Sequence, residues 1–418
     1  MPFSGLRPNR RPYILLMIGL VIRELFSFWT GHPTDFELWV RLGYAMNHGE
    51  DPYGVLGPIP GLSFANVFGY LNMPTIAYLP FWPIITGILY LLYSLIGWNN
   101  RFFYYFLLKQ PIIFGDVGLA YLMFRYVVSR STKGANWILN FWLFSPFTII
   151  ISSIWGMFDA IAICLVFLSV TATDEVKKVL WAGLGIFAKS IPIIYVAPTT
   201  MRRPKDWWPP LASIGFAGML SLTTFIMMGW PFTVVTPAIV STAIKQGWSM
   251  SAWDTLPYLT YLGYLPALNS QISLAISLLW VPAIIAFTWI AIKRFGTKGE
   301  YGLIQSLIVC TLAFLIFKAQ VTEQYALYLF AFGAVDVGVW TPARRSLLLG
   351  TMIVALVYLI VNNYFMVRFL SPVYPGFASY ERAINTAIGS IRNAVTFLSG
   401  TAFTCLNLKY LTDVLKRT

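Results

Sequence analysis

Long apolar runs, separated by short polar segments, recur along the whole of this chain. The chain is 58% hydrophobic and only 11% charged, whereas soluble proteins carry about 25% charged residues. A helix needs roughly 20 mostly apolar residues to cross a bilayer, and many of these runs approach that length. We therefore expect an all-α polytopic membrane protein. A large soluble all-α protein is the alternative, and it would have to hide nearly continuous apolar surfaces.

The runs predict about ten to thirteen transmembrane helices, some of them broken, in a single membrane domain that covers residues 1–418. The candidate helices lie at about 13–29, 74–96, 102–128, 137–153, 157–173, 179–200, 209–229, 271–292, 302–317, 322–340, 345–364 and 386–408. Three long segments between them do not span: 30–73, 230–270 and 365–385. Aromatic residues crowd all three. Because Trp and Tyr favour the membrane–water interface, we expect these segments to lie along it.

The net charge of +13 indicates cytoplasmic basic loops rather than a nucleic-acid partner, because Lys and Arg concentrate in the cytoplasmic loops of membrane proteins. Basic residues before the first apolar run predict a cytoplasmic amino terminus and a retained first helix. The first loop is then external. The basic segments 130–133, 177–178 and 202–205 should also be cytoplasmic. If every candidate helix crosses the membrane in turn, these basic segments cannot all lie on the cytoplasmic side. A break within 179–200, which holds Lys189, would help to place them there.

The first loop contains two acidic pairs, Asp35 with Glu37 and Glu50 with Asp51. Acid pairs that lie at one face of the membrane suggest chemistry on a substrate that is itself in the membrane. In the sequence TDFEL, Asp35 and Glu37 share a face if the backbone is extended and diverge if it is helical. The sequence leaves that choice open.

An ionisable residue within an apolar run carries a free-energy cost in the membrane, so each one is a functional candidate by default. The candidates are Arg23, Glu24, Lys109, Asp116, Asp159 and Lys189, together with Lys318, Glu323 and Gln324 between two apolar runs. Each also has a structural interpretation: an ion pair, a bridge between helices, a helix cap or an ordinary loop. Together they could form one polar cavity, with carboxylates for acid–base chemistry and cations for a phosphate.

Several kinds of site are absent from the sequence. It has no Walker loop, no dinucleotide-binding GxGxxG unit and no HExxH. Its two histidines exclude a multi-histidine metal site, and its three cysteines lie in apolar runs without metal or disulfide spacing. A carboxylate site for a hard cation stays open. An activated sugar, if it is the substrate, must be lipid-linked.

The order of the motifs resembles the GT-C superfamily of membrane glycosyltransferases, with the nearest likeness to the GPI mannosyltransferase I catalytic subunit and its prokaryotic relatives. The likeness covers about residues 13–340. It rests on Arg23 followed by TDFEL and GEDPY, then TIAYLPFWP, Lys109-x6-Asp116, FWLFSPFTIIISSIWGMFDAI, AGLGIFAKSIPIIYVAP, WSMSAWDTLPYL and KAQVTEQYALY. The chain departs from the family in its DxE acid pair, in Ser145 and in the late loop.

This resemblance implies a GT-C-type fold and an inverting transfer of a hexose, mannose above all, from a polyprenyl- or dolichyl-phosphate donor to a glycolipid or glycan acceptor. It implies that Asp35 is the general base and that Glu37 orients the acceptor or shares a divalent cation, Mg²⁺ or Mn²⁺. The implied phosphate ligands are Arg23, Lys109, Lys189 and Lys318. The implied sugar and acceptor contacts are Asp116, Trp155, Asp159, Asp254, Gln324 and Tyr325.

Two other functions stay open: a secondary transporter or flippase for a lipid-linked sugar, and a non-catalytic membrane subunit. The absence of a convincing internal repeat counts against the transporter. The acidic loop and the lysines count against the subunit. We expect a multi-pass protein of the cell membrane or the endoplasmic reticulum, with its site facing away from the cytoplasm. The sequence does not decide whether a small membrane accessory subunit takes part.

Overall fold

The computed structural model describes residues 10–57, 59, 76–201, 203, 205–231, 233, 244, 249–254, 270–370, 372–373 and 376–416. In these ranges the chain is helical and has no strands, as the all-α expectation requires. The principal helices are α1 (Arg11–Ser27), α2 (Asp35–Asn47), α3 (Phe81–Ile96), α4 (Arg101–Val128), α5 (Thr132–Leu143), α6 (Pro146–Ile149), the π-helix η2 (Ile150–Trp155), α7 (Asp159–Thr171), α8 (Glu175–Ala188), α9 (Ile193–Thr200), α10 (Trp208–Met228), α13 (Ser270–Leu278), α14 (Trp280–Phe295), α15 (Gly299–Phe317), α16 (Ala326–Val339), α17 (Arg345–Asn362) and α18 (Phe377–Lys416). The short 3-10 helices are η4 (Ala252–Asp254), η5 (Glu323–Tyr325), η6 (Pro342–Arg344) and η7 (Val367–Leu370).

Five helical segments of the described chain are long and apolar enough to cross a membrane: Arg101–Val128, Trp208–Met228, Gln271–Phe295, Gly299–Phe317 and Pro342–Asn362. A sixth span results if α5 and the α6–η2 segment, bent by 48°, are counted together. Helices α3 and α7 are apolar but shorter. The structure is therefore consistent with an all-α multi-pass membrane protein. The larger predicted number of spans and the GT-C-type fold stay predictions.

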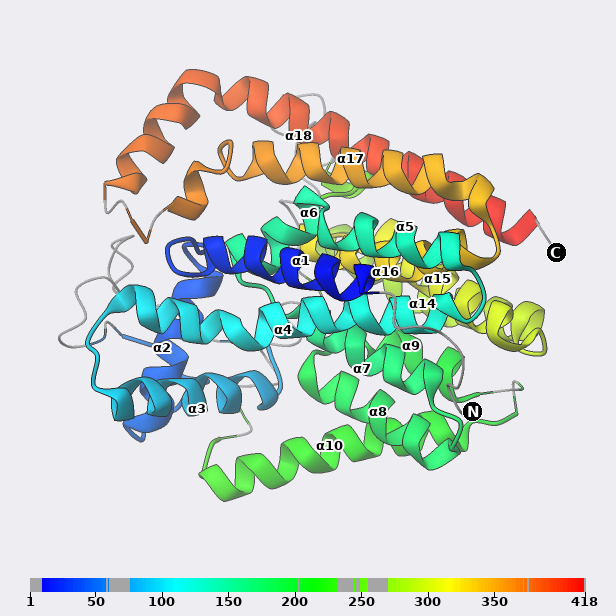
Figure 1. Ribbon diagram of the computed structural model, residues 1–418, viewed down its shortest axis with the longest axis horizontal. Coiled ribbons are helices and arrows are strands. Elements are labelled where there is room, and N and C mark those ends of the chain that lie inside the picture. The colour runs from blue at the N-terminus through cyan, green and yellow to red at the C-terminus, as the bar shows by residue number, and fades with distance from the viewer. Residues whose placement is uncertain are drawn as a thin grey trace.

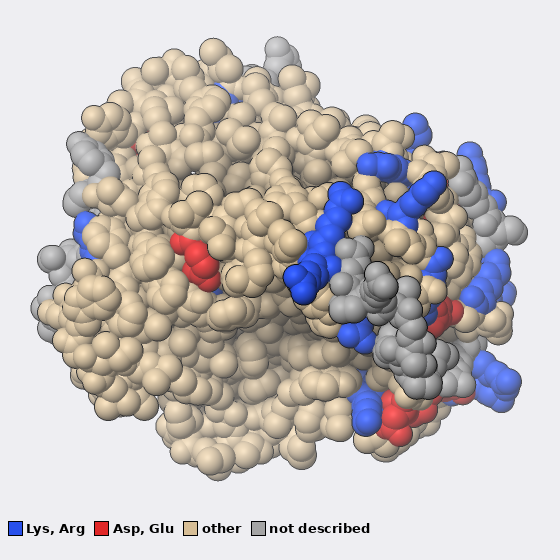
Figure 2. All heavy atoms as spheres, in the orientation of Figure 1, with Lys and Arg blue, Asp and Glu red and all other residues tan. Residues whose placement is uncertain are grey.

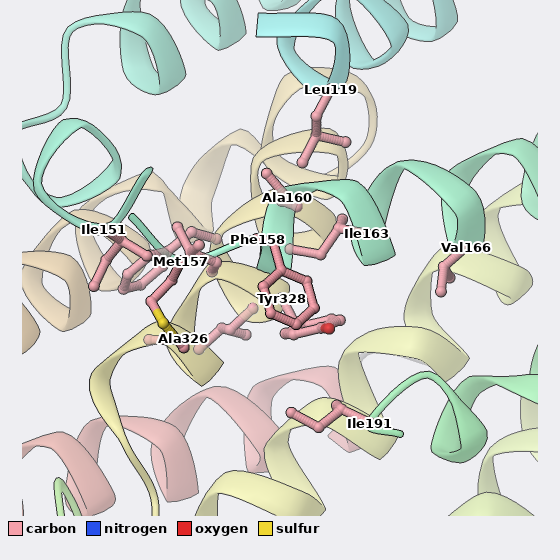
Figure 3. Close-up of a cluster of buried hydrophobic side chains, with 14 of the residues drawn as sticks. Leu119, Ile151, Met157, Phe158, Ala160, Ile163, Val166, Ile191, Ala326 and Tyr328 are labelled. Atoms are coloured by element: carbon pink, nitrogen blue, oxygen red, sulfur yellow. The ribbon is translucent and has the colours of Figure 1, made fainter. Parts of the chain in front are cut away.

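The centre of the bundle is formed by α15 and α16. Every residue from Ala326 to Gly338 is buried, and apolar residues from several helices meet around α16 and the start of α7 (Figure 3). Small residues allow close packing of the helices there: a Cβ atom on Gly134 of α5 would lie 1.9 Å from the Gly338 carbonyl oxygen of α16. Such small-residue contacts are typical of membrane helix pairs. In contrast, α3, α10 and α14 expose apolar side chains outward, as lipid-facing helices do.

Most of the helices run roughly along the longest axis of the molecule, with α2 and α3 at one end and the last turns of α18 at the other (Figure 1). One cavity at the second end is lined by the ends of α4, α7 and α9, the start of α8, and the α14–α15 turn. On the face shown in Figure 2, Lys and Arg side chains gather at this same end. We call it the basic end.

The segment 179–200 is broken, as its sequence predicted. Helix α8 stops at Ala188, Lys189 is extended (φ −156°, ψ 142°), and α9 begins at Ile193. Lys178 of α8 and Met201 after α9 line the same basic-end cavity. Helix α8 therefore enters the bundle at the same end at which α9 leaves it. This re-entrant course puts the basic residues Lys178 and Arg203 at the same end of the molecule.

Segments that were expected not to span contain helix in the described part of the chain. Helix α2 lies within 30–73, and its acidic first turn suits the positive end of the helix dipole. Helix α18 begins at Phe377, within 365–385. Most of 230–270 lies outside the described residues.

The shared basic end gives a topology prediction. In a cysteine-free background, Cys introduced at Lys133, Lys177, Lys205 or Lys298 should be protected from an impermeant maleimide in intact cells. Cys at Glu50, beyond α2, should be labelled, because the positive-inside rule makes the basic end cytoplasmic. Opposite accessibility at Lys177 and Lys205 would contradict the re-entrant course of α8 and α9. Labelling after membrane permeabilisation is the control for reactivity.

Candidate functional site

Asp35 is the most accessible acid in a group of buried polar side chains. Its Oδ2 atom accepts a hydrogen bond from the Trp155 indole at 2.9 Å and lies 3.2 Å from Nδ1 of His32. The Asp35 side chain is 32% exposed, whereas Asp159 is 0% and Glu323 is 3% exposed. Of these three acids, Asp35 is therefore the one that a substrate can reach.

His32 connects Asp35 to a stack of aromatic rings. Its imidazole stacks on the Trp155 indole with centroids 4.5 Å apart, and the Phe369 ring packs beside both. Burial lowers the pKa of His32 well below its usual value, and the positive charge of Arg368 lowers this pKa further. At neutral pH the accessible carboxylate of Asp35 therefore has a neutral imidazole beside it.

The break between α8 and α9 places Lys189 against the start of α7. Its Nζ atom lies 2.6 Å from Oδ2 of Asp159, and both side chains are at most 2% exposed. The ammonium group also lies 4.8 Å from the ring centre of Phe158, 5.5 Å from that of Tyr78 and 6.0 Å from that of Tyr325. The ion pair and the aromatic rings together offset the free-energy cost of removing the lysine ammonium from water.

Electrostatics join Asp35 and the Asp159–Lys189 pair into one site. Burial raises the pKa of Tyr325 to about 12, and the negative charges of Asp159 and Asp35 add to the rise. The same two carboxylates act on Tyr78, whose pKa burial raises well above its usual value. The two phenols therefore lie in the field of both acids, and their ring centres lie 5.5 and 6.0 Å from the Lys189 ammonium.

Glu323 and Arg368 extend this site toward α17. Glu323 accepts a hydrogen bond of 2.8 Å from the Asn362 amide. Burial raises the pKa of Glu323; Asp35 adds to that rise, and the Asn362 hydrogen bond and the positive charge of Arg368 oppose it. A guanidinium and a second acid thus lie near Asp35, on segments far from it in the sequence.

The segment that carries Arg368 has a strained backbone. Residues 364–366, none of them glycine, have φ angles of 51°, 55° and 72°, and each such residue costs on the order of 1–3 kcal/mol. They lead directly into η7, where the buried Phe369 accepts a hydrogen bond of 3.0 Å from the Gly31 backbone N–H. The surrounding contacts therefore hold this segment against the turn before α2.

Several buried polar atoms of the site have no hydrogen-bond partner in the structure. They are Oδ1 of Asp159, Oε1 of Gln324, the hydroxyl of Tyr328 and Nε of Arg368. A buried polar group without a partner costs about 1–3 kcal/mol, and such groups are rare in proteins. A polar ligand that enters the site could satisfy these four atoms.

Glu37 lies apart from Asp35, because TDFEL is helical and its two carboxylates diverge. Glu37 forms an ion pair with Arg41, one helical turn later, and Arg41 also donates to the Leu56 carbonyl oxygen at 3.1 Å. This geometry does not favour one divalent cation held by both Asp35 and Glu37. Among the described residues, no three His, Cys, Asp or Glu side chains come together as a metal site would need.

Arg23 and Asp116 form a separate buried network in the bundle. The Arg23 guanidinium pairs with Asp116 and donates to the Leu143 carbonyl oxygen at 2.9 Å. Asp116 also accepts from the Trp142 indole at 2.8 Å and the Ser152 hydroxyl at 3.0 Å. Because these bonds occupy both side chains, the geometry supports their structural interpretation. It supports neither a phosphate ligand at Arg23 nor a sugar contact at Asp116.

Lys109 lies behind the site rather than in it. Its Nζ atom donates to the carbonyl oxygen and the hydroxyl of Thr30 at 2.6 and 2.9 Å. It thereby fixes the turn that precedes Asp35, which makes it a positioning residue in this geometry. Lys318 ends α15 beside the Trp280 ring, and burial lowers its pKa to about 8. The side chain of Asp254, in η4, lies outside what the structure describes.

Of the residues predicted to form the site, the structure brings together Asp35, Trp155, Asp159, Lys189 and Tyr325, with Gln324 beside Tyr325. Sequence reasoning named Glu323 among the polar candidates but missed His32, Tyr78 and Arg368 as site residues. His32 could have been found from its place three residues before Asp35, where a turn brings the two side chains together. Arg368 had no such local signal. No model of a known protein family and no curated protein sequence matches this chain.

The buried Arg23–Asp116 network gives a stability prediction. Asp116→Ala should lower the free energy of unfolding by roughly 3–5 kcal/mol, because it leaves a guanidinium buried without its counter-ion. The measurement is thermal or denaturant unfolding of the purified protein in detergent, with exposed Glu50→Ala as the control. Replacing both partners, Arg23→Met with Asp116→Leu, should recover much of the loss. An Asp116→Ala protein of wild-type stability would instead favour a substrate contact.

The environment of Glu37 gives a pH prediction. Burial raises its pKa from 4.5 to about 7, although Arg41 opposes the rise. Between these two values the folded state holds a proton that the unfolded state has released, so stability should fall as pH rises through this window and level off above it. The slope from this one group is at most about 1.4 kcal/mol per pH unit.

Glu37→Gln should remove this contribution. Unfolding measured from pH 5 to 8 should show a difference between wild type and Glu37→Gln that changes up to about pH 7 and is constant above it. Exposed Glu50→Gln should show no such change. Parallel curves for wild type and Glu37→Gln over the whole range would contradict the raised pKa.

Proposed function

We propose that this protein is a glycosyltransferase that moves a hexose from a polyprenyl- or dolichyl-phosphate donor to a lipid-linked or glycan acceptor. The observation that carries the proposal is the accessible carboxylate of Asp35 beside buried, unpartnered polar atoms in an aromatic site. The order of sequence motifs, which resembles the GT-C enzymes, supplies the substrate class, with mannose as the implied sugar. The site lies at the end of the molecule opposite the basic end.

Asp35 acts as the general base in this proposal. The acceptor hydroxyl oxygen attacks the anomeric carbon, its proton passes to Asp35, and the bond between the anomeric carbon and the phosphate oxygen breaks. The lipid phosphate leaves with the bonding electrons, and the configuration at the anomeric carbon inverts. The Trp155 indole, 2.9 Å from Oδ2, orients the carboxylate, and the neutral imidazole of His32 borders it.

The rest of the site suits a sugar phosphate. Aromatic rings offer flat surfaces for the sugar, while the unpartnered oxygens of Gln324 and Asp159 can accept bonds from its hydroxyls. Arg368 is the cation we assign to the departing phosphate, because guanidinium and phosphate form strong charge-assisted hydrogen bonds. Lys189 is paired with Asp159. Its positive charge acts on the phosphate without direct contact, because Asp159 occupies its ammonium group. This assignment differs from the sequence expectation, which gave the phosphate to four other cations.

Asp35→Asn should slow transfer by about 10²- to 10⁴-fold, the usual contribution of a general base. The assay uses purified protein, polyprenyl-phosphate carrying tritiated mannose, and a lipid extract from the source cells. It follows the label into new lipid. Asp174→Asn is the matched control, because Asp174 caps α8 through its Oδ1 atom, which asparagine keeps. In the same assay Arg368→Gln should raise the KM for the donor.

Equal transfer by wild type and Asp35→Asn would remove Asp35 from the mechanism. The rival function is a flippase for a lipid-linked sugar, and buried charges with a broken helix are common to both. Movement of labelled donor across a liposome bilayer, without transfer of label to any acceptor, would favour the flippase and overturn the proposal.

A further inference from the structure

The basic-end cavity is separate from the Asp35 site. It has a volume of about 600 Å³, within the range of about 300–1,000 Å³ that small-molecule sites occupy. Three basic side chains line it, Arg130, Lys178 and Arg203, against one acid, Glu300. The charges of its lining thus favour an anion.

The depth and walls of the cavity fit a molecule that is part polar and part apolar. Its lining includes Thr171 and Thr199 together with Val170, Ile292 and Leu303. It continues past the start of α15 at Gly299 as far as Ser306. At 1.5 Å per residue this is about 10 Å into the bundle. The basic residues come from the helix ends and loops.

Aromatic residues place the cavity near the membrane surface. Trp207 and Trp208, at the start of α10, are 61% and 68% exposed and follow Arg203 closely in the sequence. Exposed tryptophans of this kind mark the headgroup level of a bilayer. Basic pockets between transmembrane helices at that level attract lipid phosphates.

We propose that this cavity binds a phosphate group, and specifically the phosphodiester headgroup of an anionic membrane lipid. Two of the three basic residues already have acidic partners: Nε of Arg130 lies 2.9 Å from the Glu300 carboxylate, and Nζ of Lys178 lies 3.1 Å from Oε1 of Glu175. An incoming phosphate competes with Glu300 for Arg130 and with Glu175 for Lys178, and it adds Arg203. Lys178 belongs to α8 and Arg203 follows α9, so the lipid links the two ends of the re-entrant segment whose tip carries Lys189. This site is independent of the proposed transferase activity.

The test is native mass spectrometry of the full-length protein, released from micelles that contain phosphatidylglycerol or zwitterionic phosphatidylcholine. Wild type should retain phosphatidylglycerol in preference. Lys178→Gln and Arg203→Gln should each weaken retention about fivefold, because a basic residue near the surface contributes about this factor. Lys177→Gln and Lys205→Gln are the matched controls, because these exposed neighbours do not line the cavity. Both should behave like wild type.

Glu300→Gln removes the competing carboxylate and should strengthen phosphatidylglycerol retention. Because a folding defect would weaken retention, a gain in this variant tests the site independently of folding. Added inorganic phosphate distinguishes the source of the ligand. If millimolar phosphate leaves retention unchanged, the lipid headgroup is the ligand; if it displaces the lipid, the site takes a soluble phosphate and the lipid assignment falls. Equal retention of the two lipids, or equal retention by the cavity and control variants, would overturn the proposal.

Discussion

The ion pair between Lys189 and Asp159 is the contact on which the rest of the arrangement depends. Helix α8 stops inside the bundle, where an interrupted backbone and a lysine are tolerated only if protein surrounds them. Asp159 supplies the counter-charge at 2.6 Å, and aromatic rings cover the ammonium. Without such cover the chain would have to continue through the membrane as one helix. It would then deliver the loop at Lys205 to the end opposite Lys177.

The two ends of the molecule consequently differ in chemistry. Because α8 and α9 return to their starting side, the basic loops collect at one end, and the turn before α2 lies at the other. The pair that fixes this topology also forms part of the Asp35 site, since the charge of Asp159 reaches Tyr78 and Tyr325. A substitution of Lys189 would therefore disturb both the course of the chain and the site. A loss of activity in such a variant would not by itself show a role in binding substrate.

The sequence was informative where the signal is local, and it failed where the partner is distant. Apolar runs predicted the helices, and the basic segments on either side of 179–200 predicted the break within it. The helical state of TDFEL was left open, because two carboxylates two residues apart fit either geometry. The partner of Arg23 is Asp116, 93 positions away, and nothing in the sequence selects it over other buried acids. For the same reason Arg368 was missed: its proximity to His32 depends on how α17 packs.

The difference between Asp35 and the other acids follows from where each lies in its helix. Asp116 and Asp159 lie on helices enclosed by the bundle, so a nearby cation must neutralise each of them. Asp35 begins a short helix outside the spanning segments, and an indole, a neutral imidazole, phenols and the Arg368 guanidinium surround it there. The indole hydrogen bond orients the carboxylate, and 32% of the Asp35 side chain stays exposed. A carboxylate held in this way keeps its capacity to accept a proton, which a carboxylate in a buried ion pair loses.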